Sequence, residues 1–363
     1  MGIFYATLFS TYILGLMSRI MYDKRKRIVG MFWITLVLVI LIVVAGLSRG
    51  IGDTGMYMHS YELYVNDLSS INWDRDGGFA LFNLILVQFS TNPQTLVFAA
   101  ALIIHLLNVK IFVKYRSYIE LEIYLYITSG YYLVTMNGMR QCMAAACIFV
   151  ITRLLINGKF KAYFICIVLI STLHASALAM IPLYFVVRQE AWSKNVFKLI
   201  VLSLIALLFY DEFQVILFKA LENTQYGEYS SFNEGGSSIM RTIVNSVPIA
   251  LAYLKRDEIK KIWPESNIFV NIALINCIFV AFGMFNWIFN RFTIYLQLYN
   301  FILIPYIIKN CLNGKERRLV YYGLIICYFI FFYRENVIGM NMKYNSDYLN
   351  IKYISDMFYI VGN

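Results

Sequence analysis

Long, nearly uncharged apolar runs constrain the fold of this chain more than any other feature of its sequence. Three of them cover residues 28–47, 95–109 and 319–333. Each approaches the roughly 20 residues that a helix needs to cross the hydrocarbon layer of a bilayer. In lipid the backbone must satisfy its own hydrogen bonds, so such runs form helices, and they lack the polar–apolar alternation of an outer-membrane barrel. The runs therefore predict an all-α, polytopic transmembrane bundle.

The composition agrees with a membrane protein of little soluble mass. Hydrophobic residues make up 60% of the 363 residues and charged residues 14%, where a soluble domain carries roughly 25% charged residues. The net charge of +10 is expected to come from basic loops that fix orientation in the membrane. Membrane lipids are therefore expected partners and nucleic acid is not. We expect a single transmembrane domain over residues 1–363.

Clusters of lysine and arginine mark the loops expected on the cytoplasmic side. The clusters lie within residues 19–27, 110–116, 153–161, 188–198, 255–261 and 309–318. Between them, ten crossings are expected near residues 3–18, 29–47, 95–113, 119–136, 140–157, 197–210, 240–254, 267–285, 292–309 and 319–333. Both termini then lie outside, with outer loops at 48–78 and 211–239 and an extracytoplasmic tail at 334–363.

Residues 160–188 do not fit a single crossing. They are apolar, yet both flanks are basic, and one crossing would invert the orientation of everything that follows. Two half-helices forming a re-entrant pair, broken near His174, keep the charge rule intact. A pair of short complete spans does so too and raises the total to about twelve. Both alternatives stay open.

Polar residues at the outer ends of spans are the candidates for function, because charges near lipid are costly unless they are paired or used. After the second span come Arg49, Asp53 and Tyr57, at i, i+4 spacing. The glycines at 50, 52 and 55 favour a turn that leads into a helix. The simpler interpretation is that Asp53 caps a helix beginning at Thr54.

A second candidate is Arg140, followed by Gln141, at a tight outer turn. Arginine at a helix N-terminus opposes the helix dipole, and a bound phosphate would resolve this conflict. The alternative is an arginine that snorkels to the interface.

His174, at the predicted break, could act as an acid or a base. Its alternative role is a structural histidine bonded to a neighbouring carbonyl. Arg291 and Tyr295, one turn apart at the start of a later span, form the fourth candidate, which Arg334 could join.

Together these residues suit a phosphate or pyrophosphate ligand, because the guanidinium fork matches phosphate oxygens and stays charged. No aspartate pair with DxD spacing occurs among them, so we expect no metal. The chain has no Walker motif, so ATP is not expected, and we expect no cofactor.

The order Arg49–Asp53–Tyr57, Met139-Arg140-Gln141, His174-Ala175-Ser176-Ala177 and Asn290-Arg291-Phe292 with Tyr295 resembles the EpsG/Wzy group of bacterial surface-polysaccharide polymerases. The group makes O-antigen, capsule or exopolysaccharide. The resemblance implies a GT-C-like helical fold in the bacterial plasma membrane. It also implies transfer of a growing glycan from undecaprenyl pyrophosphate to a lipid-linked repeat unit at the outer face.

For that reaction we expect Asp53, or else His174, to be the general base. Arg49, Arg140, Arg291 and Arg334 would hold the pyrophosphates together with Gln141, and Tyr57 and Tyr295 would stack on sugar rings. Whether a regulator of chain length binds is left open. A flippase for lipid-linked oligosaccharides and a membrane acyltransferase that acts on sugars through His174 remain alternatives.

Overall fold

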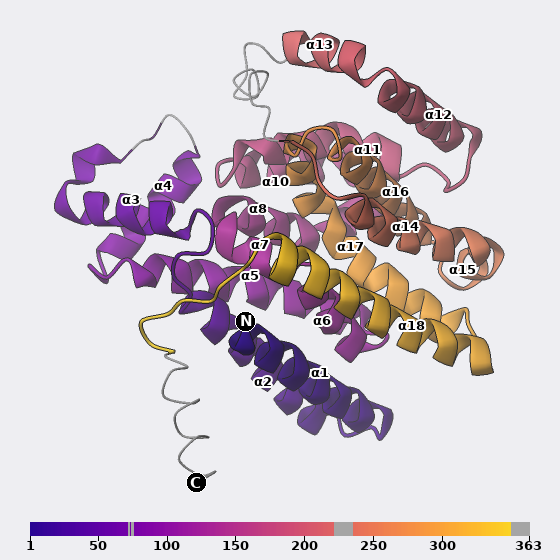
Figure 1. Cartoon of the computed structure of the whole chain (residues 1–363), viewed down its shortest axis with the longest axis horizontal. Helices are drawn as coiled ribbons and strands as arrows, with labels where there is room; N and C mark the ends of the chain where they lie inside the picture. Colours follow the sequence, from indigo (N-terminus) through magenta and orange to yellow (C-terminus); the bar gives the residue numbers. More distant parts are fainter. Residues whose placement is uncertain (72, 74–75, 221–234, 350–363) are drawn as a thin grey trace. The chain divides into compact units, whose positions relative to one another are not determined.

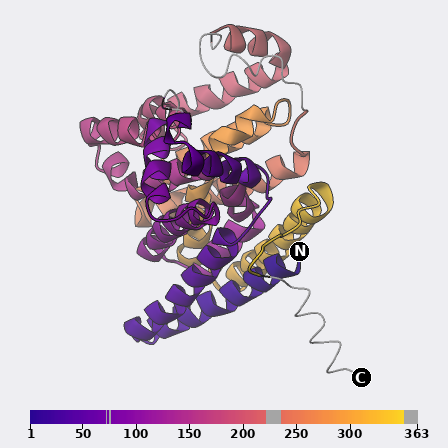
Figure 2. The same cartoon turned by 90° about the vertical axis from the view of Figure 1, so that its left-hand side faces the viewer.

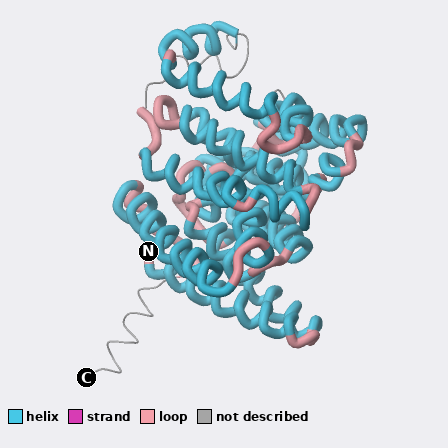
Figure 3. Tube along the Cα trace, turned by 90° about the vertical axis from the view of Figure 1, so that its right-hand side faces the viewer, coloured by secondary structure: helices cyan, strands magenta, loops and turns pink. Residues whose placement is uncertain are grey.

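The computed structural model describes residues 1–71, 73, 76–220 and 235–349. These residues form helices and no β-strand, apart from a single bridge between Arg49 and Asn345 (Figure 3). The α-helices (Figure 1) are α1 (Gly2–Asp23), α2 (Arg27–Gly46), α3 (Thr54–Asn66), α4 (Gly77–Val87), α5 (Gln94–Tyr115), α6 (Ile119–Thr128), α7 (Tyr131–Asn137), α8 (Met139–Val150), α9 (Thr152–Ile156), α10 (Phe160–Ser171), α11 (Met180–Val187), α12 (Lys194–Leu208), α13 (Tyr210–Ala220), α14 (Ile239–Leu254), α15 (Arg256–Ile262), α16 (Ser266–Phe282), α17 (Ile288–Asn310) and α18 (Gly314–Phe332). Three shorter elements are η1 (Leu68–Ser70), η2 (Ala175–Ala179) and the π-helix η4 (Tyr333–Gly339).

The predicted all-α, polytopic bundle is confirmed. Four helices, α1, α2, α5 and α17, are long and apolar enough to cross a membrane. A fifth crossing results if α12 and α13, which meet at an angle of 101°, form one broken span. Six shorter apolar segments of 10–17 residues accompany them in the described part of the chain. The count of ten to twelve crossings stays a prediction.

Several of the predicted crossings are broken in the structure. The run at 119–136 divides into α6 and α7 at Gly130, whose φ of 85° is a left-handed conformation that glycine adopts at no steric cost. The predicted outer loop at 211–239 begins inside α13, and its residues 221–234 lie outside the described residues, as do residues 350–363 of the predicted tail.

The described residues group into two compact units. The first comprises Met1–Thr152, Lys161–Leu178 and the chain from Arg318 onward. The second comprises Arg153–Phe160 and Ala179–Arg317. Both contain apolar helices, and the prediction of one transmembrane domain over residues 1–363 stays a prediction.

In the first unit, α6 is the innermost helix, since all of its residues are buried. It packs against α1, which in turn runs beside α2 (Figures 1 and 2). The carboxylate of Glu120 on α6 is fully buried, and it lies 2.9 Å from Nε of Arg19 and accepts a hydrogen bond from the hydroxyl of Tyr321 at 2.9 Å. Pairing of this kind offsets the cost of removing the carboxylate from water.

In the second unit, α16 packs against α17 and α14. The two flanks of the 160–188 segment also meet here. The guanidinium of Arg188 donates hydrogen bonds to the carbonyl oxygens of Leu155 and Ile156. A single crossing would hold these flanks about 30 Å apart, so the segment is a hairpin. As predicted, its helices break at residues 172–174. α10 has 12 residues and is about 18 Å long.

Candidate functional site

The best-defined cluster of charged side chains in the first unit is centred on Asp76. This residue precedes α4 and has a left-handed backbone with φ of 52°, a conformation that aspartate tolerates better than most side chains. One carboxylate oxygen, Oδ1, accepts a hydrogen bond from the backbone N–H of Ala175 at 3.0 Å. The other, Oδ2, lies 2.8 Å from Nη1 of Arg140 and 3.3 Å from Nδ1 of His174.

A close contact between α4 and the tip of the broken hairpin brings Asp76 to His174. The N–H of Gly78 donates to the carbonyl oxygen of Thr172 at 2.9 Å. A Cβ at position 78 would lie 2.2 Å from Oγ1 of Thr172, so only glycine permits this approach. The turn at 172–174 then places His174 and Ala175 against the Asp76 carboxylate.

Arg140 lies in the first turn of α8, where sequence analysis predicts an anion. Nη1 donates to Asp76, while Nε lies 3.4 Å from the Tyr57 hydroxyl. The guanidinium is also 5.4 Å from the centre of the Tyr57 ring and 5.8 Å from that of Phe79, within cation–π range. The arginine is therefore held in place by an ion pair, and is not a freely snorkelling side chain.

The position of His174 differs from the structural alternative considered for it. Its partner is the Asp76 carboxylate, and not a neighbouring carbonyl. The side chain is 18% exposed, and within the described residues Nε2 has no hydrogen-bond partner. An aspartate at Nδ1 favours the tautomer whose proton is on Nδ1, which leaves Nε2 as a proton acceptor.

The surroundings of Asp76 keep its carboxylate ionised. Burial by itself raises its pKa, but the hydrogen bond with His174, the charges of His174 and Arg140 and the N–H of Ala175 outweigh burial and lower the pKa below the usual 3.8. A carboxylate engaged by three donors is a weak base. Its expected role is to orient the side chains of Arg140 and His174 beside it.

Three of the four motifs predicted from the sequence come together around this cluster. The N–H of Asp53 donates to Oδ1 of Asn137 at 2.8 Å, and Thr54 Oγ1 donates to the carbonyl of Met136. Asp53 itself is exposed. A helix does begin at Thr54, but the Asp53 side chain makes no capping hydrogen bond. Its carboxylate is one of the charges that act on the Tyr57 hydroxyl.

Gln141 ties the second motif to the third. Its side-chain amide lies 3.4 Å from Oγ of Ser176, and both residues are buried. Gln141 therefore braces the loop that carries His174.

The remaining predicted residues have other surroundings. Arg49 pairs with Asp347 of the C-terminal segment, and its N–H donates to the carbonyl of Asn345 at 2.8 Å. Arg334 is exposed in η4. In the second unit, the Arg291 guanidinium lies 4.5 Å from the centre of the Trp287 ring, and Tyr295 is buried.

A family model describes nearly the whole chain. The match is to the EpsG family and covers residues 31–350. The chain belongs to the EpsG family. This is a family of Wzy-like polysaccharide polymerases, so the resemblance identified from the sequence is confirmed, and the chain is a multi-pass membrane glycosyltransferase of the surface-polysaccharide polymerase type. No curated protein and no solved structure matches the chain.

Asp76, the residue at the centre of this site, was not among the residues predicted from the sequence. Asp76 ends the sequence Asp74-Arg75-Asp76, which has DxD spacing and directly precedes a short apolar run. That spacing, within the predicted outer loop, was the signal available. It also removes the sequence argument against a metal, which relied on the absence of such a pair. Among the described residues, no group of three or more His, Cys, Asp or Glu side chains could hold a metal ion.

Proposed function

We propose that this polymerase transfers a glycan chain from undecaprenyl pyrophosphate to a lipid-linked repeat unit at the outer face of the bacterial plasma membrane. One observation carries the assignment of the site. Asp76 holds both a histidine, whose Nε2 has no partner among the described residues, and an arginine at a helix N-terminus. Such a site combines a general base with an anion-binding group, the two functions that glycosyl transfer from a pyrophosphate needs.

In this proposal, His174 is the general base. The acceptor hydroxyl would donate to Nε2, and the proton would move to this nitrogen as the hydroxyl oxygen attacks the anomeric carbon of the donor. The Asp76 carboxylate then stabilises the imidazolium that forms, without itself taking the proton. Asp53, the first choice from the sequence, is exposed and stays a second candidate.

The leaving group is the pyrophosphate on the polyprenyl lipid. The bond between the anomeric carbon and the pyrophosphate oxygen breaks as the new glycosidic bond forms, and the negative charge on that oxygen rises. Nη2 of Arg140 has no hydrogen-bond partner within the described residues, and the N-cap residue of α8, Gly138, offers no side-chain cap to the first N–H groups. These donors suit the developing charge.

The proposed reaction uses no metal ion, and the surroundings of Asp76 support this part of the proposal. Its carboxylate already faces Arg140, His174 and the N–H of Ala175, and the adjacent guanidinium of Arg140 disfavours a divalent cation. Polymerisation that persists in EDTA is the expected result. Loss of activity in EDTA, restored by Mg²⁺ or Mn²⁺, would instead implicate Asp74 and Asp76 as ligands.

The decisive experiment incubates the purified full chain in proteoliposomes with lipid-linked repeat units and measures glycan length. His174→Ala is expected to lower the rate about 10²-fold or more. The matched control is His59→Ala, which removes a histidine whose side chain is 71% exposed. Equal rates for the two variants would remove His174 from the base role.

The same assay separates the alternatives. A polymerase yields long glycans, whereas a flippase or an acyltransferase leaves repeat units at their original length. In cells, loss of the protein should accumulate single lipid-linked units on the outer leaflet. Accumulation only on the inner leaflet would favour the flippase, and loss of acyl groups would favour the acyltransferase.

A further inference from the structure

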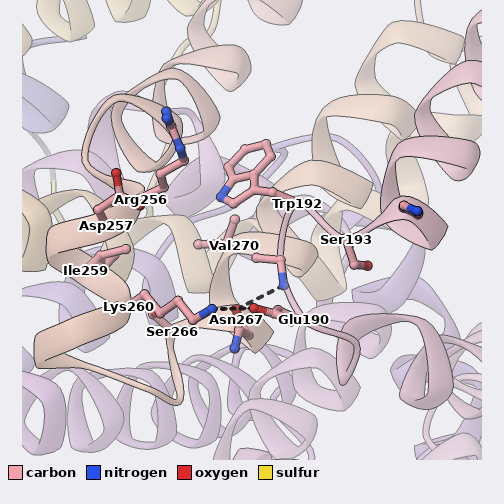
Figure 4. Close-up of a pocket in the computed structure, with 12 residues that line it drawn as sticks. Glu190, Trp192, Ser193, Arg256, Asp257, Ile259, Lys260, Ser266, Asn267 and Val270 are labelled. Carbon is pink, nitrogen blue, oxygen red and sulfur yellow. Dashed lines mark hydrogen bonds and ion pairs between the residues drawn. The ribbon is translucent and has the colours of Figure 1, made fainter.

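A cavity in the second unit is lined by none of the residues assigned to the transfer reaction. Its volume is about 390 Å³, within the range of small-ligand pockets. It is formed where the segment before α12 meets α15 and the start of α16 (Figure 4). Its charged lining residues are Glu190, Lys194, Arg256, Asp257 and Lys260. Two of the predicted cytoplasmic basic clusters, 188–198 and 255–261, thus meet at one site.

The walls of the cavity are held by specific contacts. Lys260 forms an ion pair with Glu190, drawn as a dashed line in Figure 4. The N–H of Ala191 donates to Oδ1 of Asn267 at 2.9 Å. The Trp192 ring packs edge-on against Tyr253, with ring centres 5.1 Å apart. These contacts link the segment before α12 to α14, α15 and α16.

The charges that line the cavity favour a single negative charge in the ligand. Lys260 is neutralised by Glu190, so two cations, Lys194 and Arg256, remain against one anion, Asp257. The net charge of the five side chains is +1. A phosphodiester, which carries one negative charge, matches this balance.

An exposed apolar stripe begins at the cavity and follows α12. Lys194 lines the cavity, and Phe197, Val201, Leu204 and Leu208 follow on the same helix face at helical spacing. Each of these four side chains is exposed, from 38% for Val201 to 80% for Leu208. Cations at one end of an apolar stripe are the arrangement that a phospholipid needs for its headgroup and acyl chains.

Trp192 adds an independent observation at the same place. Its φ of 66° is a left-handed conformation that a bulky residue rarely adopts. Backbone strain of this kind is typically found at ligand-binding sites and switches. Tryptophan is also the side chain most typical of the membrane–water interface.

We propose that this cavity binds a phosphate-bearing anion, and that the phosphodiester headgroup of an anionic membrane phospholipid is its ligand. Lys194 and Arg256 supply the positive charge, Trp192 forms a wall at the interface, and the acyl chains lie along α12. The site is independent of the transfer reaction, so its test needs no activity measurement.

The test follows the melting temperature of the purified full chain in neutral detergent. Three probes are titrated: phosphatidylglycerol, phosphatidylcholine with the same acyl chains, and inorganic phosphate. The variant Lys194→Gln/Arg256→Gln removes the two lining cations that form no ion pair among the described residues; Arg256 itself contacts Tyr253. The control Lys198→Gln/Lys261→Gln removes the same charge from α12 and α15 at exposed positions that do not line the cavity.

Phosphatidylglycerol is expected to stabilise the wild-type chain more than phosphatidylcholine does. The cavity variant should weaken its apparent affinity at least fivefold, while the control stays within twofold of wild type. If the cavity variant, and not the control, also weakens the binding of inorganic phosphate, the phosphate site is supported and its ligand is a soluble anion. Equal responses of the cavity variant and the control, or equal effects of the two lipids, would overturn the proposal.

A second variant, Asp257→Asn, tests the proposal even if Lys194→Gln/Arg256→Gln fails to fold. It removes the unpaired anion and raises the net charge of the cavity to +2, so phosphatidylglycerol should bind about fivefold more tightly. Unchanged or weaker binding by a folded Asp257→Asn chain would contradict the charge argument.

Discussion

Asp76 and His174 are 98 residues apart in the chain, yet Oδ2 of the carboxylate lies 3.3 Å from Nδ1 of the ring. The contact joins the residue before α4 to the tip of the broken hairpin. It favours the tautomer of the imidazole with its proton on Nδ1, and Nε2 has no hydrogen-bond partner in the part of the chain that the structure describes. Arg140 shares the same carboxylate oxygen, so one aspartate sets the position of both proposed catalytic groups.

Asp76→Asn should lower kcat about 10²- to 10⁴-fold, because an amide neither fixes the tautomer nor stabilises the imidazolium. Initial rates of glycan extension measure this effect. Asp53→Asn is the control, since that carboxylate is exposed, and it should change kcat less than about threefold. A large loss in Asp53→Asn with an active Asp76→Asn would reverse the two assignments.

Protonation of Asp76 should destabilise the first unit at acidic pH. Its pKa is lower in the folded chain than its usual 3.8, because the bonds from His174, Arg140 and Ala175 outweigh burial. A lowered carboxyl pKa contributes stability that is complete above the unfolded value and is lost as pH falls through the folded value. Melting temperatures of wild type and Asp76→Asn should therefore differ at pH 6, and the difference should shrink as pH falls below 3.8 toward the lower pKa of the folded chain. A difference in melting temperature that stays constant down to pH 3 would contradict the stabilising role of the ionised Asp76 carboxylate.

Gly78→Ala should displace the hairpin tip from α4. The new Cβ would meet Oγ1 of Thr172 at 2.2 Å and its backbone carbon at 3.1 Å. Overpacking of this kind costs about 1–3 kcal/mol and should move His174 away from Asp76. Thermal unfolding and kcat together measure the effect. Gly77→Ala is the matched control, because a Cβ there meets nothing within 4 Å. Equal melting temperatures and equal kcat values for the two variants would show that the contact between Gly78 and Thr172 does not position His174.

Asp347→Asn should release Arg49 for substrate. The pair is half-exposed on both sides, so its loss should change stability by less than about 1 kcal/mol. If Arg49 binds pyrophosphate, removing the competing carboxylate should lower KM severalfold, and Arg49→Gln should raise KM about tenfold, the equivalent of about 1.4 kcal/mol. An unchanged KM in both variants would exclude Arg49 from the binding site.

Elements that depend on local pattern were predicted well. α1, α2, α5 and α17 lie where uncharged apolar runs required helices. The basic flanks of residues 160–188 predicted a broken segment, and Arg188 does return to Leu155 and Ile156. Arg140, His174 and Tyr57 were chosen as candidates because charged and polar groups at span ends are costly without a purpose. The structure places the three around Asp76, and their roles stay predictions.

The centre of the site was not predicted, because it depends on a contact between distant parts of the chain. Asp76 was not among the predicted residues, and Asp53 was the first choice for the general base. Packing of Gly78 against Thr172 brings the Asp76 carboxylate to His174, and Arg140 reaches the same carboxylate from α8. The sequence by itself determined that this chain is a helical membrane polymerase of the EpsG family, because hydrophobic runs and short motifs are local. The tertiary structure decided which carboxylate orients the histidine, because that choice depends on distances between residues far apart in the chain.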